Sequence, residues 1–226
     1  MIDKELLKNN KEACLERADK LPEISAAQAL PEGTCPVKWS LEIIKAARAE
    51  ACGKSVMCRD GLWQLQLMLE AVIAGQSSSE DFEVMKETLT AMKTVGCPNS
   101  KKAAELVLAT IATYADEWDL HIRRKRCTSL SCFYSLYIDP AVCKGNGACL
   151  KNCPNGAVAG AAGMISVIKD DSALKTDAFI ASCPNGAIKK YGGPVKPRTP
   201  ADPVPVGSFG AEGGAAAGGG RRRRRG

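Results

Sequence analysis

The chain has few of the features that mark membrane or exported proteins. No apolar run approaches the roughly 20 residues that a membrane-spanning helix needs, and residues 1–20 are charged and helical in pattern, unlike the apolar core of a signal peptide. Apolar residues make up 45% of the sequence and aromatic residues only 5%, which is typical of a globular protein. We therefore expect a cytoplasmic protein without a membrane segment.

The residues that hydrolytic or acid–base catalysis needs are also scarce. Histidine occurs once, as His121, and neither a Ser/His/Asp arrangement nor a pair of catalytic carboxylates can be recognised. No G-x-G-x-x-G run follows a strand-like segment, so a dinucleotide-binding domain is not predicted. We expect a chain that is not itself catalytic.

Positive charge is concentrated near the C-terminal end. The formal net charge is +6, and Arg221 to Arg225 carry most of it, so the rest of the chain has no particular attraction for nucleic acid or anionic lipid. The arginine run is compatible with docking to an acidic protein surface, with weak RNA binding or with a solvated tail that has no partner. Nucleic-acid binding is not expected.

The first half of the chain is predicted to be helical. Residues 1–31 form a charged amphipathic arm, in which Cys14 falls near helical spacing with apolar neighbours. A helical bundle is predicted for residues 32–126, because four segments there have apolar residues at helical spacing and short connections. These segments are residues 37–49, 62–75, 79–92 and 101–126.

The second half has a different pattern. A strand-like run at residues 133–138 precedes two near-copies of one motif, at 152–158 and 182–188, which indicate an internal repeat. Residues 193–226 are rich in proline, glycine and alanine and are predicted to be disordered. The predicted fold class is therefore α+β, with the helical bundle followed by a small α+β domain over residues 127–192.

The chain contains 11 cysteines, and an odd number without a signal peptide argues for metal or cluster ligation instead of a disulfide framework. Three of them, Cys143, Cys149 and Cys153, follow the spacing C-x2-C-x2-C-x3-C-P, with Asn146 at the second position. Residues 134–192 thus resemble a two-cluster bacterial ferredoxin domain.

This resemblance implies one modified cluster and one lost cluster. The cysteine before proline crosses to the other cluster, so Cys183 joins Cys143 and Cys149, with Asn146 as a weak fourth donor. Three thiolates suit a 3Fe-4S cluster, or a 4Fe-4S cluster with one iron held by water or a side chain; the alternative is that they are relics in a cluster-free fold. Cys153 would serve the second cluster, whose other three ligand positions are occupied by Ala173, Thr176 and Phe179. We therefore expect this cluster to be absent, with the Phe179 side chain filling part of its volume.

A second set of cysteines lies in the predicted bundle, in the segment from Cys52 to Cys58. It resembles the run S-C-G-x-C-x2-C-R-x-G of the NADH-binding flavoprotein subunit of respiratory complex I and of its relatives in electron-bifurcating hydrogenases and formate dehydrogenases. The resemblance implies a 4Fe-4S cluster held by Cys52, Cys58 and Cys97, with Ser55 in place of the second cysteine. Serine can hold iron but is harder to deprotonate than a thiol; the alternative is that Cys52 is simply a small buried residue.

A third set consists of Cys35, His121, Cys127 and Cys132. The spacing H-x5-C-x4-C matches the junction before the ferredoxin domain in hydrogenase-type flavoprotein subunits, which also have a cysteine at the place of Cys35. Three cysteines and one histidine are donors that structural Zn²⁺ prefers in a closed tetrahedral site. The alternative is a histidine that caps a helix C-terminus, beside unpaired thiols.

Residues 33–192 therefore resemble the C-terminal part of such a flavoprotein subunit, without its FMN- and NADH-binding region. The resemblance implies an iron–sulfur electron-transfer subunit of a larger NAD-linked oxidoreductase complex, of hydrogenase or formate dehydrogenase type. Its partners would be a flavin- and NADH-binding subunit and other subunits of that complex. The alternative is a cluster-free structural or regulatory paralogue that zinc holds together.

Overall fold

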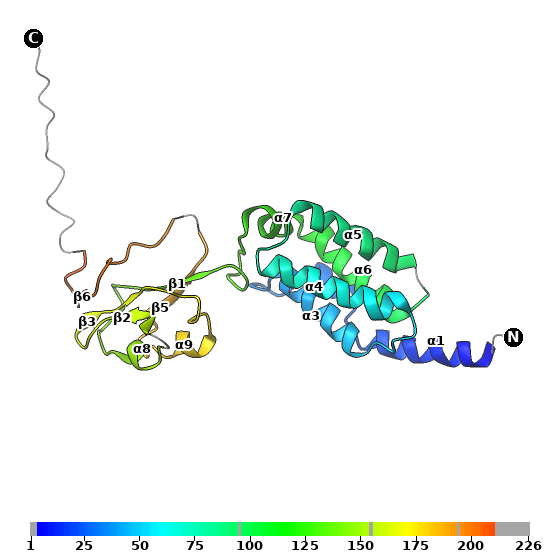
Figure 1. Cartoon of the computed structure of the whole chain (residues 1–226), viewed down its shortest axis with the longest axis horizontal. Helices are drawn as coiled ribbons and strands as arrows, with labels where there is room; N and C mark the ends of the chain where they lie inside the picture. Colours follow the sequence, from blue (N-terminus) through cyan, green and yellow to red (C-terminus); the bar gives the residue numbers. More distant parts are fainter. Residues whose placement is uncertain (1–3, 95, 154–155, 194, 211–226) are drawn as a thin grey trace, which may run out of the picture. The chain divides into compact units, whose positions relative to one another are not determined.

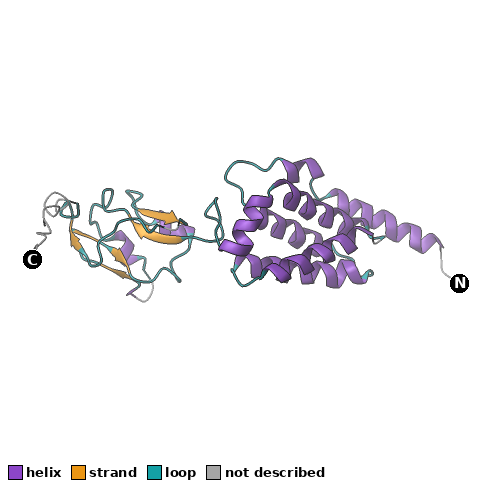
Figure 2. Ribbon diagram, turned by 90° about the horizontal axis from the view of Figure 1, so that it is seen from above, coloured by secondary structure: helices purple, strands orange, loops and turns teal. Residues whose placement is uncertain are grey.

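The computed structural model describes residues 4–94, 96–153, 156–193 and 195–210 (Figure 1). The chain divides into two compact units between residues 134 and 135. The first unit is helical, and the second contains short strands and short helices (Figure 2), which confirms the α+β fold class. None of the described helices combines the length and the apolar composition that crossing a membrane requires.

The first unit is a bundle organised around helix α6. Its elements in chain order are α1 (Lys4–Asp19), α2 (Ile24–Gln28), α3 (Pro36–Ala49), the π-helical turn η1 (Met57–Gly61), α4 (Leu62–Ile73), α5 (Ser79–Thr94), α6 (Pro98–Thr113) and α7 (Ala115–Arg124). Helices α1, α2, α3 and α5 all pack against α6, and α3 also packs against α4. The charged arm thus forms part of the bundle.

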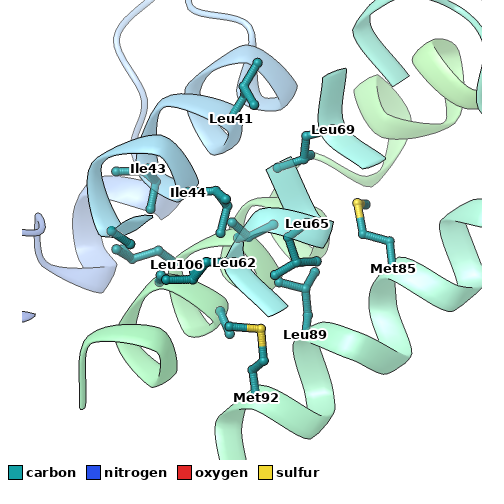
Figure 3. Packing of buried hydrophobic residues seen from close by; sticks show 14 of the residues in the cluster. Leu41, Ile43, Ile44, Leu62, Leu65, Leu69, Met85, Leu89, Met92 and Leu106 are labelled. Carbon is teal, nitrogen blue, oxygen red and sulfur yellow. The ribbon is translucent and has the colours of Figure 1, made fainter. Parts of the chain in front are cut away.

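Apolar side chains from α3, α4, α5 and α6 fill the core of this unit (Figure 3). The labelled side chains are Leu41, Ile43, Ile44, Leu62, Leu65, Leu69, Met85, Leu89, Met92 and Leu106. Within α4 and α5 they recur every three or four residues, which places them on one face of each helix. Burial of each apolar side chain of this kind contributes about 1.5–3 kcal/mol to the free energy of folding. The packed bundle therefore fixes the positions of the loops that carry cysteines.

Two helices of the bundle begin with proline directly after a cysteine. Pro36 follows Cys35 at the start of α3, and Pro98 follows Cys97 at the start of α6. Proline suits the first helical position because the N–H that it lacks has no partner there and its φ angle is already helical. Each Cys-Pro pair therefore places a thiol at a helix N-terminus, next to backbone N–H groups of the first turn that have no partner within the helix.

The prediction of one helix over residues 101–126 is wrong. Helix α6 ends at Thr113 and α7 begins at Ala115, because Tyr114 leaves the helical conformation with φ −117° and ψ 42°. The Tyr114 hydroxyl accepts a hydrogen bond from the Leu30 N–H (2.8 Å) and donates one to the Gln28 carbonyl (3.2 Å). These contacts are tertiary, and the periodicity of the sequence does not reveal them.

Within its described residues, the second unit contains three short antiparallel strand pairs. They are β1 (Ser135–Ile138) with β5 (Ile188–Tyr191), β2 (Val158–Ala159) with β4 (Val167–Ile168), and β3 (Met164–Ile165) with β6 (Val204–Pro205). A short helix comes directly before each copy of the repeated motif, α8 (Ala148–Lys151) before residues 152–158 and α9 (Asp177–Ala181) before residues 182–188. The pairing of β1 with β5 joins a strand that precedes the first copy to a strand that begins at the end of the second.

Residues 195–210 are not the disordered tail that their composition predicts. Strand β6 pairs with β3, and the Lys169 ammonium donates hydrogen bonds to the Ala201 carbonyl and the Asp202 carboxylate, both at 2.8 Å. Val206 lies so close to Gly145 that a Cβ atom added there would come within 2.9 Å of it. The remainder of the predicted tail, residues 211–226 with the arginine run, lies outside the described residues.

Candidate metal centres

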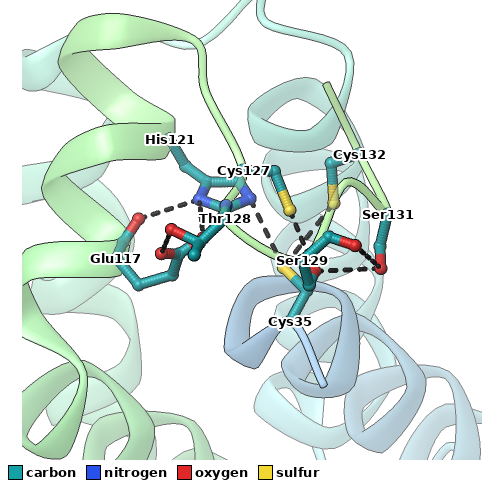
Figure 4. A network of polar contacts seen from close by, with 8 residues as sticks. All are labelled: Cys35, Glu117, His121, Cys127, Thr128, Ser129, Ser131 and Cys132. Carbon is teal, nitrogen blue, oxygen red and sulfur yellow. Dashed lines mark hydrogen bonds and ion pairs between the residues drawn. The ribbon is translucent and has the colours of Figure 1, made fainter. Parts of the chain in front are cut away.

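Cys35, His121, Cys127 and Cys132 meet in the first unit (Figure 4). Cys35 precedes α3, His121 lies in the last turn of α7, and the other two cysteines lie in the loop after α7. The three sulfur atoms and the ring nitrogen all lie within 4.8 Å of one another. Among the residues that the structure describes, no other group of three or more His, Cys, Asp or Glu side chains gathers so closely.

The distances in this group match those around a single ion. The Cys35 Sγ atom is 3.3 Å from His121 Nε2 and 3.7 Å from Cys132 Sγ. A tetrahedral Zn²⁺, with bonds of about 2.3 Å to sulfur and about 2.0 Å to nitrogen, separates such pairs of ligand atoms by about 3.5–3.8 Å. Spacing and donor type thus both suit one closed metal site.

Neighbouring polar groups orient the ligands of this site (Figure 4). His121 Nδ1–H donates to the Glu117 carbonyl (2.8 Å), so Nε2 is the nitrogen left to face Cys35. The Glu117 carboxylate accepts hydrogen bonds from the backbone N–H (2.9 Å) and hydroxyl (2.6 Å) of Thr128, and the Ser129 hydroxyl lies 3.1 Å from Cys127 Sγ. Such outer contacts are typical of metal-binding histidines and thiolates.

The crowding of these groups shifts their proton affinities strongly. Burial opposes protonation of His121, but contacts with the thiols of Cys127 and Cys35 outweigh it and raise its pKa to about 10. Contacts with Cys132 and Cys35 lower the pKa of Cys127, and the reciprocal contact with Cys127 raises the pKa of Cys132.

The three motif cysteines of the bundle also converge. Cys58 lies in η1 and is only 1% exposed, and Cys97 precedes α6. Contact between their thiols raises the pKa of Cys58 and lowers that of Cys97 to about 5. A π-helical turn within helical structure is rare and often marks a functional site.

Backbone and side-chain N–H groups surround these thiols. Gly53 has φ 72°, and the next N–H, from Lys54, donates to Cys52 and is the main cause that lowers its pKa, ahead of the Cys14 thiol and the Arg17 guanidinium. The Asn99 amide is 3.9 Å from Cys58 Sγ. Buried thiols with N–H donors are the chemistry that an iron–sulfur cluster requires, so the residues present fit such a group.

Cys14 joins this site, although no motif in the sequence points to it. It is buried on α1, and its Sγ atom lies 3.9 Å from Cys52 Sγ. Burial and the Cys52 thiol raise the pKa of Cys14 to about 11. Ser55, the expected fourth donor, is half-buried, and its carbonyl accepts the Arg59 N–H at 2.9 Å. The signal that could have revealed Cys14 is its position among the apolar residues of an amphipathic helix.

Two of the predicted ligands of the second unit, Cys143 and Cys183, are connected by hydrogen bonds to one end of the β1–β5 pair. The Asp139 N–H donates to the Ala187 carbonyl (2.8 Å), and the Cys143 N–H donates to the Asp139 carbonyl (2.9 Å). Cys183 Sγ in turn accepts the Ala187 N–H at 3.4 Å, so Cys143 and Cys183 are both tied to this pair. Cys149 is buried in α8.

Asn146, the weak fourth donor that the sequence predicts, takes part in a turn of this unit. Its side chain is exposed, and its Oδ1 atom accepts the Ala148 N–H at 3.1 Å. An amide oxygen engaged in such a turn serves the backbone at the start of α8, which leaves three thiols for this site.

Residues at the ligand positions of the second ferredoxin-type cluster have structural roles in the second unit. Phe179 is 4% exposed, and its N–H is capped by the Thr176 hydroxyl at 3.2 Å at the start of α9. Both residues line a pocket together with Ala173. Cys153 Sγ accepts the Val158 N–H at 3.1 Å, so one thiol of that set is still in place.

We expect no cluster at these positions. Replacing Cys153 with alanine in the full chain should leave the iron and acid-labile sulfide content after anaerobic reconstitution unchanged, because a single thiol cannot hold a cluster. The parent protein should bind no more than two clusters in all. A loss of about four irons in the variant, or a third cluster in the parent, would contradict the assignment of Ala173, Thr176 and Phe179 to the ligand positions.

Comparison with known proteins places these sites in a family context. Residues 38–121 match the NADH-ubiquinone oxidoreductase-F iron-sulfur binding region. The chain is 28% identical over 134 residues to a protein of Solidesulfovibrio fructosivorans named NADP-reducing hydrogenase subunit HndC, a match that covers 58% of this chain and 27% of the relative. It is 28% identical over 99 residues to the F 2 subunit of an NADH-quinone oxidoreductase of Rhizobium meliloti (strain 1021), a match that covers 43% of this chain and 24% of that protein.

As its motifs predict, the chain therefore resembles part of the NADH-binding flavoprotein subunits of complex I and of related hydrogenases. It spans about a quarter of the length of the curated relatives that it matches. The matched region contains Cys52, Cys58, Cys97 and His121. Cys14 and Cys35 lie before it, and the second unit lies after it.

Proposed function

We propose that this chain is an iron–sulfur electron-transfer subunit of a larger NAD-linked oxidoreductase complex, of hydrogenase or formate dehydrogenase type. In this proposal the flavin and the NADH-binding site belong to another chain of the complex. The observation that carries the proposal is the group of thiols at Cys52, Cys58 and Cys97, of which the last two are buried, within the region that matches an iron–sulfur binding family.

The bundle supplies what such a cofactor needs from a protein. When bound, an iron–sulfur cluster accepts and releases single electrons at a potential that hydrogen bonds to sulfur and exposure to solvent adjust. Cys97 offers its thiolate at the N-terminus of α6, where backbone N–H groups of Asn99 and Ser100 point at the sulfur. Cys58 is shielded from water by the core, and the Asn99 amide approaches its sulfur.

The other two sites would have different roles in the same subunit. We assign a structural zinc ion to Cys35, His121, Cys127 and Cys132, because zinc has no redox chemistry and these ligands form a closed set. Cys143, Cys149 and Cys183 are the ligands of a 3Fe-4S or 4Fe-4S cluster in the second unit, which would extend the electron path.

The cluster content of the full chain tests this proposal. After anaerobic reconstitution with iron and sulfide, we expect broad visible absorption that bleaches on reduction and an iron–sulfur EPR signal in the oxidised or reduced protein. Neither property can come from zinc. If neither is found, electron transfer is ruled out, and a cluster-free structural paralogue held by zinc becomes the better account.

A further inference from the structure

The bundle site contains one more sulfur than its sequence motif provides. Cys14 Sγ lies 3.9 Å from Cys52 Sγ and also contacts the Cys97 thiol, which in turn contacts Cys58. The four sulfurs are therefore one connected group. We propose that Cys14, and not Ser55, is the fourth ligand of the bundle cluster, an inference that rests on the proposed function.

The four sulfurs do not form one compact ligand set. Among the described residues, only the donor atoms of Cys35, His121, Cys127 and Cys132 are grouped so closely that they all lie within 4.8 Å of one another. A single ion draws all of its ligands into one tetrahedron, whereas a 4Fe-4S cluster takes each thiolate on a different iron. The thiols around Cys14 form a series of pairwise contacts and not one tetrahedron.

Thiol chemistry also favours Cys14 over Ser55. Iron–sulfur clusters are held by the sulfur atoms of cysteines, whereas a serine hydroxyl is harder to deprotonate and is a poorer donor to iron. Ser55 starts the helical segment of Cys58, because its carbonyl accepts the Arg59 N–H at 2.9 Å. It thus has a backbone role that does not depend on its hydroxyl.

Helix α1 is held where Cys14 can reach the site. Cys14 and Ala18 lie one turn apart and are 9% and 4% exposed, so they form the face that packs into the bundle. At the end of the helix, the Lys20 ammonium contacts the Glu50 carboxylate at 2.7 Å, two residues before Cys52. Arg17 adds a positive charge near Cys52, which would offset part of the negative charge of four thiolates.

The test uses the full chain with Cys143 and Cys149 both replaced by alanine, so that the iron counted belongs to the bundle. In this parent we compare Cys14→Ala, Ser55→Ala and the double variant Cys14→Ala/Ser55→Cys, all reconstituted anaerobically. The readouts are iron, acid-labile sulfide and the EPR spectra of oxidised and reduced protein. Circular dichroism of the iron-free variants controls for folding, since alanine is well tolerated in a helix.

We expect about four irons in the parent and in Ser55→Ala, and about three in Cys14→Ala, with the signal of an oxidised 3Fe-4S cluster. Adding Ser55→Cys to Cys14→Ala restores the motif cysteine and should bring the content back to about four. A full cluster in Cys14→Ala together with iron loss in Ser55→Ala overturns the ligand assignment alone. If the parent itself binds no iron, the proposed cluster function of the bundle fails, and this inference fails with it.

Discussion

Removal of the metal from Cys35, His121, Cys127 and Cys132 is expected to loosen the first unit more than any single side-chain change in its core. Structural zinc contributes an apparent free energy of about 10–16 kcal/mol in zinc-finger peptides, against about 2–5 kcal/mol for truncation of a buried leucine. The effect should be largest in the loop after α7, because two of the four ligands lie there.

Elemental analysis of anaerobically purified protein should find close to one zinc per chain. A chelator, or the substitution Cys127→Ala, should lower the unfolding temperature and increase hydrogen exchange in the loop after α7. The matched control is Cys153→Ala, which truncates a cysteine of the second unit to which no metal or cluster is assigned. Absence of zinc, or equal shifts in both variants, would contradict the zinc assignment.

The second large effect is expected from Cys58→Ala, which should remove at least one iron per chain and abolish the EPR signal of the intact bundle cluster. Cys58 is 1% exposed, so no water molecule from bulk solvent can readily take its place as a ligand. The loss of a buried thiolate therefore exposes an iron that nothing else in the pocket can hold. Iron, sulfide and EPR spectra of the reconstituted full chain measure the effect.

Cys149→Ala serves here as the comparison that locates the signal. If the EPR signal survives Cys58→Ala and disappears in Cys149→Ala, the cluster belongs to the second unit, and the bundle is not the redox site. If each variant removes part of the iron, both units carry clusters. Unfolding temperatures of the iron-free proteins separate ligand loss from misfolding, because Cys58 also belongs to the core of the bundle.

Local patterns in the sequence are enough to predict much of this architecture. The helical periods predict the positions of α3, α4 and α5, and the Cys-Pro pairs at residues 35–36 and 97–98 start helices because proline suits the first helical position. The resemblance to flavoprotein subunits, which depends on motif spacing, is confirmed by the match over residues 38–121. The donor atoms of Cys35, His121, Cys127 and Cys132 lie together in the structure, and their role as zinc ligands stays a prediction.

Local sequence patterns do not predict the structure that depends on contacts between distant segments. The break at Tyr114 depends on hydrogen bonds to Leu30 and Gln28. The order of residues 195–210 depends on the pairing of β6 with β3 and on Lys169. Composition and periodicity indicate only the conformation that a segment favours in isolation. These segments adopt their structure because of contacts with other segments of the chain.

The sequence by itself determined which residue types are available for metal chemistry and that one thiol is missing from the bundle motif. Only the tertiary structure decided which side chain comes to that place, because the packing of α1 on α6 brings Cys14 next to Cys52 from another part of the chain. Motif spacing is a property of short loops, in which the backbone sets the distance between ligands. A ligand delivered by a separate helix depends on the burial of that helix face, and no spacing rule contains it.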